Sequence, residues 1–265
     1  MTVNGTEDVA LEWDAVDGRL HEDNVRRLRR RIFKAAKEED LAKVRSLQKM
    51  MPRSWSDTLV SVRQVAQRNT GRATAGIDGE AALTAPARMA LAVRVHRSIR
   101  TWDPLPVKRV YVPKANAKLR PLGIPVLMDR AHQARAKNAL EPEWEARFEP
   151  RSYGFRPGRS CQDAIEAVYD TCKGRGAARA WTLDADLAAA FDKLDHAHLM
   201  SAIGSFPGRG LIRRWLTAGV FEPGKGFAPT EEGSPALRIG GRDFPIALER
   251  RVARAGGGGR GPVRA

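Results

Sequence analysis

The apolar residues of the first hundred positions repeat at the spacing of amphipathic helices. Three helices are expected between about Asp23 and Arg68, with these inward residues in turn: Val25, Leu28, Ile32 and Ala36; Leu41, Val44 and Leu47; Trp55, Leu59, Val62 and Ala66. A further helix from Pro86 to Arg100 would place Met89, Val93, His96 and Ile99 on one side. The pattern predicts a helical domain over 23–100 that follows an extension over 1–22.

The hydrophobic period changes after Pro104 and Pro106. Residues 107–113 alternate as a strand does, 116–118 are typical of a turn, and 119–125 predict a second strand, so a basic hairpin is expected. A helix is also expected around Leu211 to Leu216, and Asp195 and His196 are interpreted as a helix start. The predicted fold class is therefore α+β.

Charge narrows the choice of partner. The 265 residues include 46 Lys and Arg against 31 Asp and Glu, which gives a net charge of +15 and favours a polyanion such as nucleic acid. No stretch approaches the roughly 20 apolar residues that span a bilayer, and Met1 to Asp14 lacks a hydrophobic signal core. We therefore expect a cytoplasmic protein without a membrane partner, with Cys161 and Cys172 reduced and packed.

A run of cations lies opposite the apolar face of the first helix. It consists of Arg26, Arg27, Arg29, Arg30, Arg31 and Lys34. A solvated helix face and a phosphate-binding face both explain this run, and both interpretations stay open. In the second interpretation, Arg26 and Arg30 are RNA-binding residues.

Longer motifs then carry a family resemblance. They are Lys118-Leu-Arg-Pro-Leu-Gly-Ile-Pro125 with Asp129, Arg130 and Gln133; Phe148-Glu-Pro150; and Tyr153-Gly-Phe-Arg-Pro-Gly-Arg-Ser160. This pattern resembles the fingers of group II intron reverse transcriptases, also called maturases. Leu47-Gln48 and the Gly76-Ile-Asp-Gly79 loop are similar to the N-terminal domain of that family. The resemblance covers about Trp13 to Pro235.

The resemblance and the residue types together suggest two groups of contacts. Lys118, Arg120 and Arg130 are expected to bind the phosphates of the nucleotide or template, because such anions need cationic side chains on a rigid support. A charged hairpin edge that prevents aggregation is the alternative. RNA contacts are expected from Phe155 by stacking and from Arg156 and Arg159 by charge.

The resemblance places the chemical centre in the segment from Trp181 to Asp192. Asp186 would be the first metal-binding and catalytic aspartate of the palm, and the Leu187 carbonyl would add a ligand. Two Mg²⁺ ions are the implied cofactor, since they clamp the attacking and leaving oxygens in nucleotidyl transfer. Phe191 would contact the sugar of the incoming nucleotide and favour deoxynucleotides.

The remaining aspartates of that family are not found in this sequence. No Tyr-Ala-Asp-Asp motif follows Asp186, and Gly233-Ser234-Pro235 begins a family block that does not continue. We expect fingers and a partial palm over 101–235, followed by a disordered or frameshifted tail over 236–265. The residues from Gly240 to Arg254 can be back-translated with every codon that each residue allows. When those bases are read one position later, the shifted frame can spell Gly-Gly-Val-Ile-Ser-Pro-Leu-Leu-Leu-Asn-Val-Ala-Leu-His-Gly, which resembles the missing block.

Three functional interpretations follow. The first is an RNA-directed DNA polymerase of the group II intron type that is truncated and inactive alone, with intron or template RNA and a DNA primer as partners. The second is a noncatalytic RNA-binding splicing factor, because maturases also bind intron RNA. The third is a remnant without function.

Overall fold

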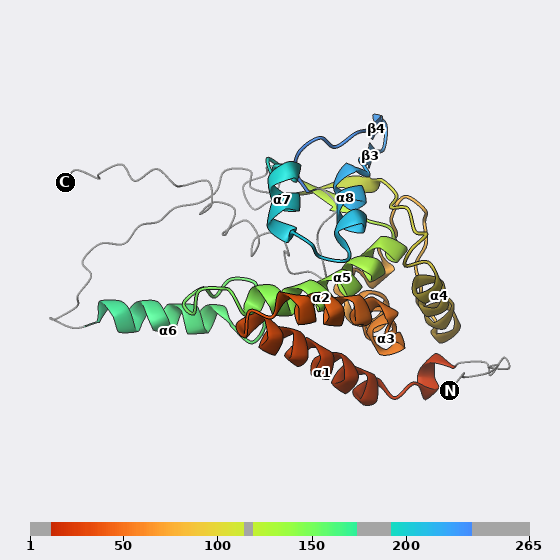
Figure 1. The fold of residues 1–265 in the computed structure, drawn as a ribbon. Helices are drawn as coiled ribbons and strands as arrows, with labels where there is room; N and C mark the ends of the chain where they lie inside the picture. Colours follow the sequence, from red (N-terminus) through yellow and green to blue (C-terminus); the bar gives the residue numbers. More distant parts are fainter. Residues whose placement is uncertain (1–11, 114–118, 174–191, 235–265) are drawn as a thin grey trace, which may run out of the picture.

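The structure is a computed structural model in which residues 12–113, 119–173 and 192–234 are described. Its helices are α1 (Gly18–Lys37), α2 (Leu41–Met50), α3 (Trp55–Arg63), α4 (Ala85–Arg97), α5 (Leu127–Glu145), α6 (Cys161–Cys172), α7 (His196–Ile203) and α8 (Arg209–Thr217). Shorter helical turns are η1 (Trp13–Ala15), η2 (Met51–Arg53), η3 (Gln64–Arg68) and η4 (Thr70–Ala73). The strands are β1 (Val107–Pro113), β2 (Leu119–Ile124), β3 (Val220–Glu222) and β4 (Gly226–Ala228). The predicted α+β class is confirmed: a helical part is followed by a small sheet with helices (Figure 1).

The first helix buries the face that its periodicity predicts. Val25, Ile32 and Ala36 are buried, so this part of the prediction is confirmed. The helix begins earlier than expected, at Gly18, because the Asp17 side chain accepts hydrogen bonds from the backbone N–H groups of the first turn. Asp195 caps α7 in the same way and confirms the expected helix start.

Helix α5 is the centre of the molecule. Its residues join two hydrophobic clusters, one shared with α1, α2, α7 and α8 and the other shared with α3 and α4. Leu140 belongs to the first cluster and Leu127 to the second, and both are fully buried. Since one helix packs against both groups, α5 fixes the position of α8 relative to the N-terminal helices (Figure 1).

The four strands form one mixed sheet in the order β2-β1-β3-β4. The predicted hairpin is confirmed: β1 and β2 are antiparallel, with Val112 opposite Arg120. Strand β3 runs parallel to β1, with Val107 opposite Val220, and β4 returns antiparallel to β3. The predicted turn over 116–118 lies outside the described residues.

Two predictions of packing are wrong. Helix α4 ends at Arg97 and buries Met89, Ala92 and Val95, whereas Val93 and His96 are only half-buried. The predicted face was therefore rotated, although His96 does pack between helices, edge-on to the Trp55 ring. Cys161 and Cys172 are free but exposed, because none of the residues of α6 is buried.

Among the described residues, no helix is both long and apolar enough to cross a membrane.

Candidate nucleic-acid interface

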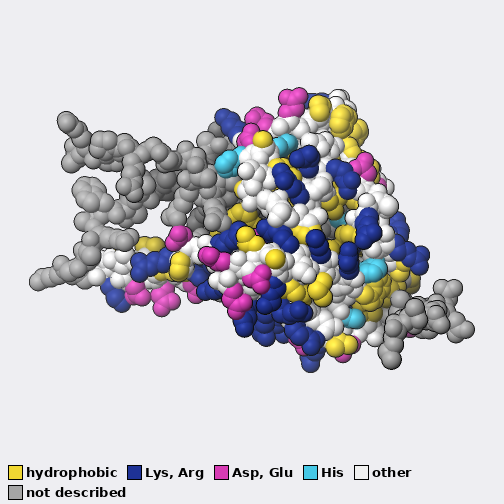
Figure 2. All heavy atoms as spheres, viewed as in Figure 1, with side chains coloured by type: hydrophobic (Ala, Val, Ile, Leu, Met, Phe, Trp, Pro, Cys, Tyr) yellow, Lys and Arg dark blue, Asp and Glu magenta, His cyan; other side chains and the backbone are white. Residues whose placement is uncertain are grey.

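The exposed side of α1 carries a dense set of cations. Arg26 and Arg30 are both exposed; Arg26 forms an ion pair of 2.6 Å with Asp23, while Arg30 makes no ion pair with a described residue. Arg29 differs from the prediction, since its guanidinium lies against α5 and donates a 2.5 Å hydrogen bond to Glu141. Figure 2 shows Lys and Arg side chains gathered along this helix. The RNA contacts of Arg26 and Arg30 stay predictions.

The hairpin presents Arg120 on an exposed strand. Arg120 lies near the outer end of β2, where the residues opposite it on β1 are exposed as well. At the other edge of β1, the Tyr111 hydroxyl donates to the Glu222 carboxylate at 3.1 Å and so ties the hairpin to β3. The sheet thus holds Arg120 on a fixed support, whereas Lys118 lies outside the described residues.

Arg130 lies on α5 and not on the sheet. Its guanidinium donates to the backbone carbonyls of Gly71 at 3.1 Å and Thr74 at 2.7 Å. These bonds fasten the glycine-rich loop to the first turn of α5. A phosphate contact by Arg130 stays a prediction, and the geometry adds a structural role that the sequence did not indicate.

Arg156 is the anchor of the loop that follows α5. Its side chain is 4% exposed, and its Nε and Nη2 atoms face the Glu145 carboxylate at 3.0 and 2.6 Å. The Nη1 atom donates to the carbonyls of Glu149 at 2.6 Å and Ser152 at 2.8 Å. A buried guanidinium with a bidentate carboxylate and two carbonyl acceptors is well satisfied. The contact of Arg156 with RNA stays a prediction that would require some of these bonds to open.

This anchored loop leaves two other side chains accessible. Phe155 has a φ of 59°, a left-handed conformation that costs a bulky residue about 1–2 kcal/mol, and its ring is exposed. Arg159 is half-buried; it lies over the Tyr153 ring at 5.3 Å and donates to the Pro150 carbonyl at 2.5 Å. Such strain persists only where neighbours enforce it, and the bonds of the adjacent Arg156 hold this loop in place. Stacking of the Phe155 ring on a base stays a prediction.

The hairpin and this loop lie at opposite ends of α5. Strand β2 ends just before the helix and the loop begins just after it, and 19 residues of helix span about 28 Å. The structure therefore does not bring Arg120 together with Phe155 and Arg159. One ligand that reached both ends would have to be a polymer.

Asp129 is a residue whose role the sequence did not reveal. It is 1% exposed, and its Oδ1 accepts hydrogen bonds from the indole N–H groups of Trp102 at 2.7 Å and Trp215 at 2.8 Å. Its Oδ2 accepts from the Leu105 backbone N–H at 3.2 Å. Burial raises the pKa of this carboxyl. The only sequence signal was indirect: buried indole N–H groups need acceptors.

The predicted metal and nucleotide residues of the palm belong to the segment between residues 173 and 192. Asp186, Leu187 and Phe191 lie outside the described residues. Within the described ranges, no group of three or more His, Cys, Asp or Glu side chains is arranged to hold a metal ion. The Mg²⁺ site therefore stays a prediction for Asp186 and the Leu187 carbonyl.

Comparison with known proteins identifies the scaffold. The family model of the N-terminal domain of reverse transcriptase matches residues 13–95, and that of reverse transcriptase (RNA-dependent DNA polymerase) matches residues 112–236. Protein YkfC of Escherichia coli is 38% identical over 209 residues, which are 76% of this chain and 54% of YkfC. The group II intron-encoded protein LtrA of Lactococcus lactis is 36% identical over 140 residues (51% and 22%), and maturase-like protein 1 of Euglena gracilis is 31% identical over 130 residues (49% and 28%). The chain thus spans about half of YkfC and less of the others. It belongs to the group II intron reverse transcriptase and maturase family.

Proposed function

We propose that this chain binds RNA as the N-terminal, fingers and partial palm portion of a group II intron type reverse transcriptase. The observation that carries the proposal is the accessibility of Arg120 at one end of α5 and of Phe155 and Arg159 at the other, on a reverse transcriptase scaffold. The cations on α1 extend this surface, and a net charge of +15 supports binding to a long polyanion.

The reaction of the family is RNA-directed DNA polymerisation with Mg²⁺. Two ions need several hard oxygen ligands, and the residues of this chain that fit are the Asp186 carboxylate and the Leu187 carbonyl. The 265 residues contain no Tyr-Ala-Asp-Asp motif to supply the other carboxylates. We therefore propose that the 265-residue polypeptide does not polymerise by itself, and that 236–265 is a frameshifted replacement of the family sequence. The nucleotide sequence of the gene tests the frameshift. Codons that give stops or unrelated residues in the shifted frame would refute it.

Binding and primer extension by the purified polypeptide test the two parts of this proposal separately. A single-stranded RNA and an RNA template annealed to a DNA primer are titrated at increasing salt, and extension is then assayed with Mg²⁺ and deoxynucleotides. We expect salt-sensitive binding without extension. Extension that Asp186→Ala abolishes would overturn the inactivity, and absence of binding at low salt would overturn the RNA-binding function.

Single substitutions locate the contacts. Arg120→Ala and Arg159→Ala should each reduce the slope of log K against log salt by about 0.7 for every phosphate that the arginine neutralises. Arg94→Ala is the matched control, because Arg94 is an exposed arginine of α4 that pairs with Glu80 in the loop before this helix. Arg156→Ala should instead lower the melting temperature, because its bonds hold the loop. If the salt dependence of binding has the same slope for Arg120→Ala, Arg159→Ala and the control, neither Arg120 nor Arg159 contacts the RNA.

The second candidate is a noncatalytic splicing factor. It is supported by the similarity to a maturase-like protein and by the fact that the cationic surfaces do not depend on an intact metal site. Splicing of a group II intron RNA, with and without the polypeptide, discriminates it from a remnant without function. Faster splicing that Asp186→Ala leaves unchanged would favour this candidate.

A further inference from the structure

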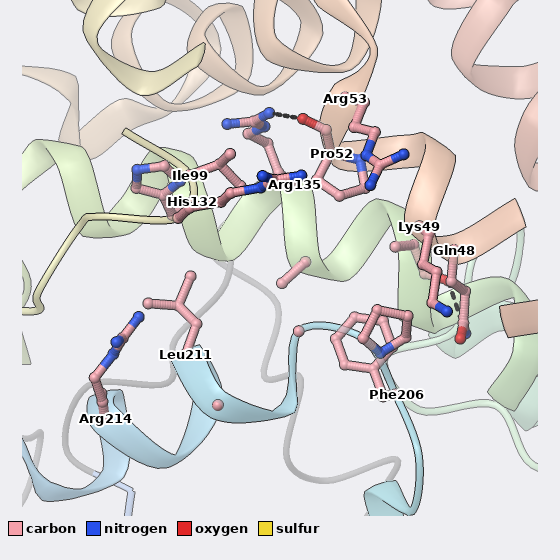
Figure 3. Close-up of a pocket in the computed structure, with 16 residues that line it drawn as sticks. Gln48, Lys49, Pro52, Arg53, Ile99, His132, Arg135, Phe206, Leu211 and Arg214 are labelled. Carbon is pink, nitrogen blue, oxygen red and sulfur yellow. Dashed lines mark hydrogen bonds between the residues drawn. The ribbon is translucent and has the colours of Figure 1, made fainter. Parts of the chain in front are cut away.

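A cavity of about 500 Å³ lies between the N-terminal helices and α8, away from the hairpin and the Phe155 loop. Its walls come from α2 and η2, from the residues after α4, from one side of α5, and from the start of α8 with the turn that precedes it. Figure 3 shows Arg214 rising from α8 toward α5, with Lys49 and Arg53 beside the opposite wall. The volume is that of ligand-binding pockets.

The lining of this cavity is strongly cationic. Lys49, Arg53, Arg100, Arg135 and Arg214 line it, and no Asp or Glu side chain among the described residues does. Arg135 is paired with buried Asp57, and Arg214 lies 3.8 Å from the exposed Asp103. Lys49, Arg53 and Arg100 are exposed and make no ion pair with any residue in the described ranges. Like charges brought together around one space repel each other unless an anion enters it.

A second cavity adjoins the first at Arg53. It has a volume of about 350 Å³ and is lined by Asn24, Arg27, Leu28, Arg31, Met50, Arg53 and Ser54, again without a carboxylate from the described part of the chain. Arg53 lines both cavities, so the two are neighbours, one against α1 and the other against α8. We call the exposed cations that line them the phosphate track: Arg27, Arg31, Arg53, Lys49, Arg100 and Arg214. These residues are far apart in the sequence and meet only in the fold.

The larger cavity also has groups suited to a sugar or base. Ile99, Phe206 and Leu211 give it an apolar wall. His132, which is 1% exposed, lines the cavity; its Nε2 lies 3.2 Å from the Ser98 hydroxyl, whereas its Nδ1 has no hydrogen-bond partner among the described residues. Cations and an apolar surface together match a nucleotide better than they match a bare anion.

We infer that the phosphate track binds the sugar-phosphate backbone of a single-stranded RNA segment, and that the larger cavity admits one nucleotide of it. This inference rests on the proposed RNA-binding function and adds a second surface to it. A succession of cations along two adjoining cavities favours a repeating anion, and a cavity of this volume has no room for a duplex.

Two charge reversals in the full chain test the track. Arg53→Glu and Arg100→Glu change exposed side chains, so both variants should fold, with melting temperatures close to that of the original chain. Each should weaken binding of a single-stranded oligouridylate about tenfold at low salt and reduce the salt slope by about 1. Arg94→Glu is the control outside the track and should bind much more tightly than either variant.

The outcomes separate the track from the proposed function. If the track variants match Arg94→Glu while Arg120→Ala and Arg159→Ala lose affinity, the track is refuted and the RNA-binding function stands. If the original chain does not bind oligouridylate at all, both fail. Inorganic tripolyphosphate and a nucleoside triphosphate are titrated in parallel: binding of either that Arg53→Glu abolishes, without a change for oligouridylate, would assign the cavity to a free phosphate compound and overturn the inference.

Discussion

Asp129 shows how one carboxylate can join three segments of this chain. Its oxygens accept hydrogen bonds from Trp102, Leu105 and Trp215, so the start of α5 is linked both to the segment before β1 and to α8. A buried donor that loses its acceptor costs about 1–3 kcal/mol, because the hydrogen bond to water given up on folding is not replaced. The three donors therefore make Asp129 a point where a single substitution affects several elements.

We expect Asp129→Ala to lower the free energy of unfolding by at least about 3 kcal/mol, since it leaves three donors without their acceptor. Urea unfolding of both proteins measures the difference. Asp103→Ala is the matched control; that carboxylate is 84% exposed and 3.8 Å from Arg214, so its loss should cost less than about 1 kcal/mol. Equal losses for the two variants would mean that the indole bonds contribute little.

At the scale of elements, the glycine-rich loop before α4 is docked on the start of α5. Arg130 holds the carbonyls of Gly71 and Thr74, and Gly76 lies against the backbone of Val126. A Cβ atom at Gly76 would be 2.6 Å from the Val126 Cα, which is too close for any side chain. The glycine is thus required by the close approach of two backbones.

Gly76→Ala should destabilise the protein by about 1–3 kcal/mol, because backbone and not a flexible side chain must shift. Gly154→Ala is the control: a Cβ atom there meets nothing within 4 Å, and the expected change is within about 0.5 kcal/mol. Thermal unfolding of the two variants provides the comparison. A Gly76→Ala protein as stable as the control would show that the loop does not pack closely on α5.

The elements that could be predicted are those with a clear hydrophobic period. Helix α1 has one buried and one charged face, and β1 alternates next to proline signals, so both were found from the sequence. Helix α5 is buried around most of its circumference, polar residues included, and therefore lacks an amphipathic pattern. Strands β3 and β4 have three residues each, and β3 pairs with a strand more than a hundred residues away, which no local signal can reveal.

The candidate site was predictable as a set of motifs but not as a set of roles. Phe155, Arg156 and Arg159 are neighbours in one cationic motif, yet Arg156 points inward to Glu145 while Phe155 is exposed. Burial of Arg156 depends on the end of α5 packing beside it, a tertiary feature. Only the α1 cations of the phosphate track, Arg27 and Arg31, had a sequence signal, because the others come from three further parts of the chain that meet only in the fold.

At the scale of the whole molecule, cations are distributed around a neutral, buried framework. Within the framework, Arg45, Gln48 and Arg147 all bond to Glu143, and Asn138 donates to Asp57 at 2.8 Å. Exposed residues such as Arg30, Arg53 and Arg100, in contrast, make no ion pair with a described carboxylate. Binding of RNA should relieve their mutual repulsion, in addition to the contacts that it makes.

Two buried groups of that framework oppose each other in their effect on stability with pH. Burial raises the pKa of Asp57 to about 7, so the stability associated with its neutral form is lost as the pH rises from about 4 through about 7. Burial, aided by the charge of Arg135, lowers the pKa of His132 to about 3. An unfolded histidine takes up a proton below about pH 6.5 whereas folded His132 does not, so the unfolded state gains stability as the pH falls.

Substitution of His132 separates the two effects, because Asp57 is present in both proteins. Relative to His132→Gln, the original chain should lose about 1.4 kcal/mol of stability per pH unit below about pH 6.5, or about 2 kcal/mol between pH 6.5 and pH 5. Urea unfolding of both proteins at several pH values measures this difference directly. Parallel stability curves would contradict the lowered pKa: they would show that folded His132 takes up a proton in the same pH range as an unfolded histidine, and so becomes a buried cation near Arg135.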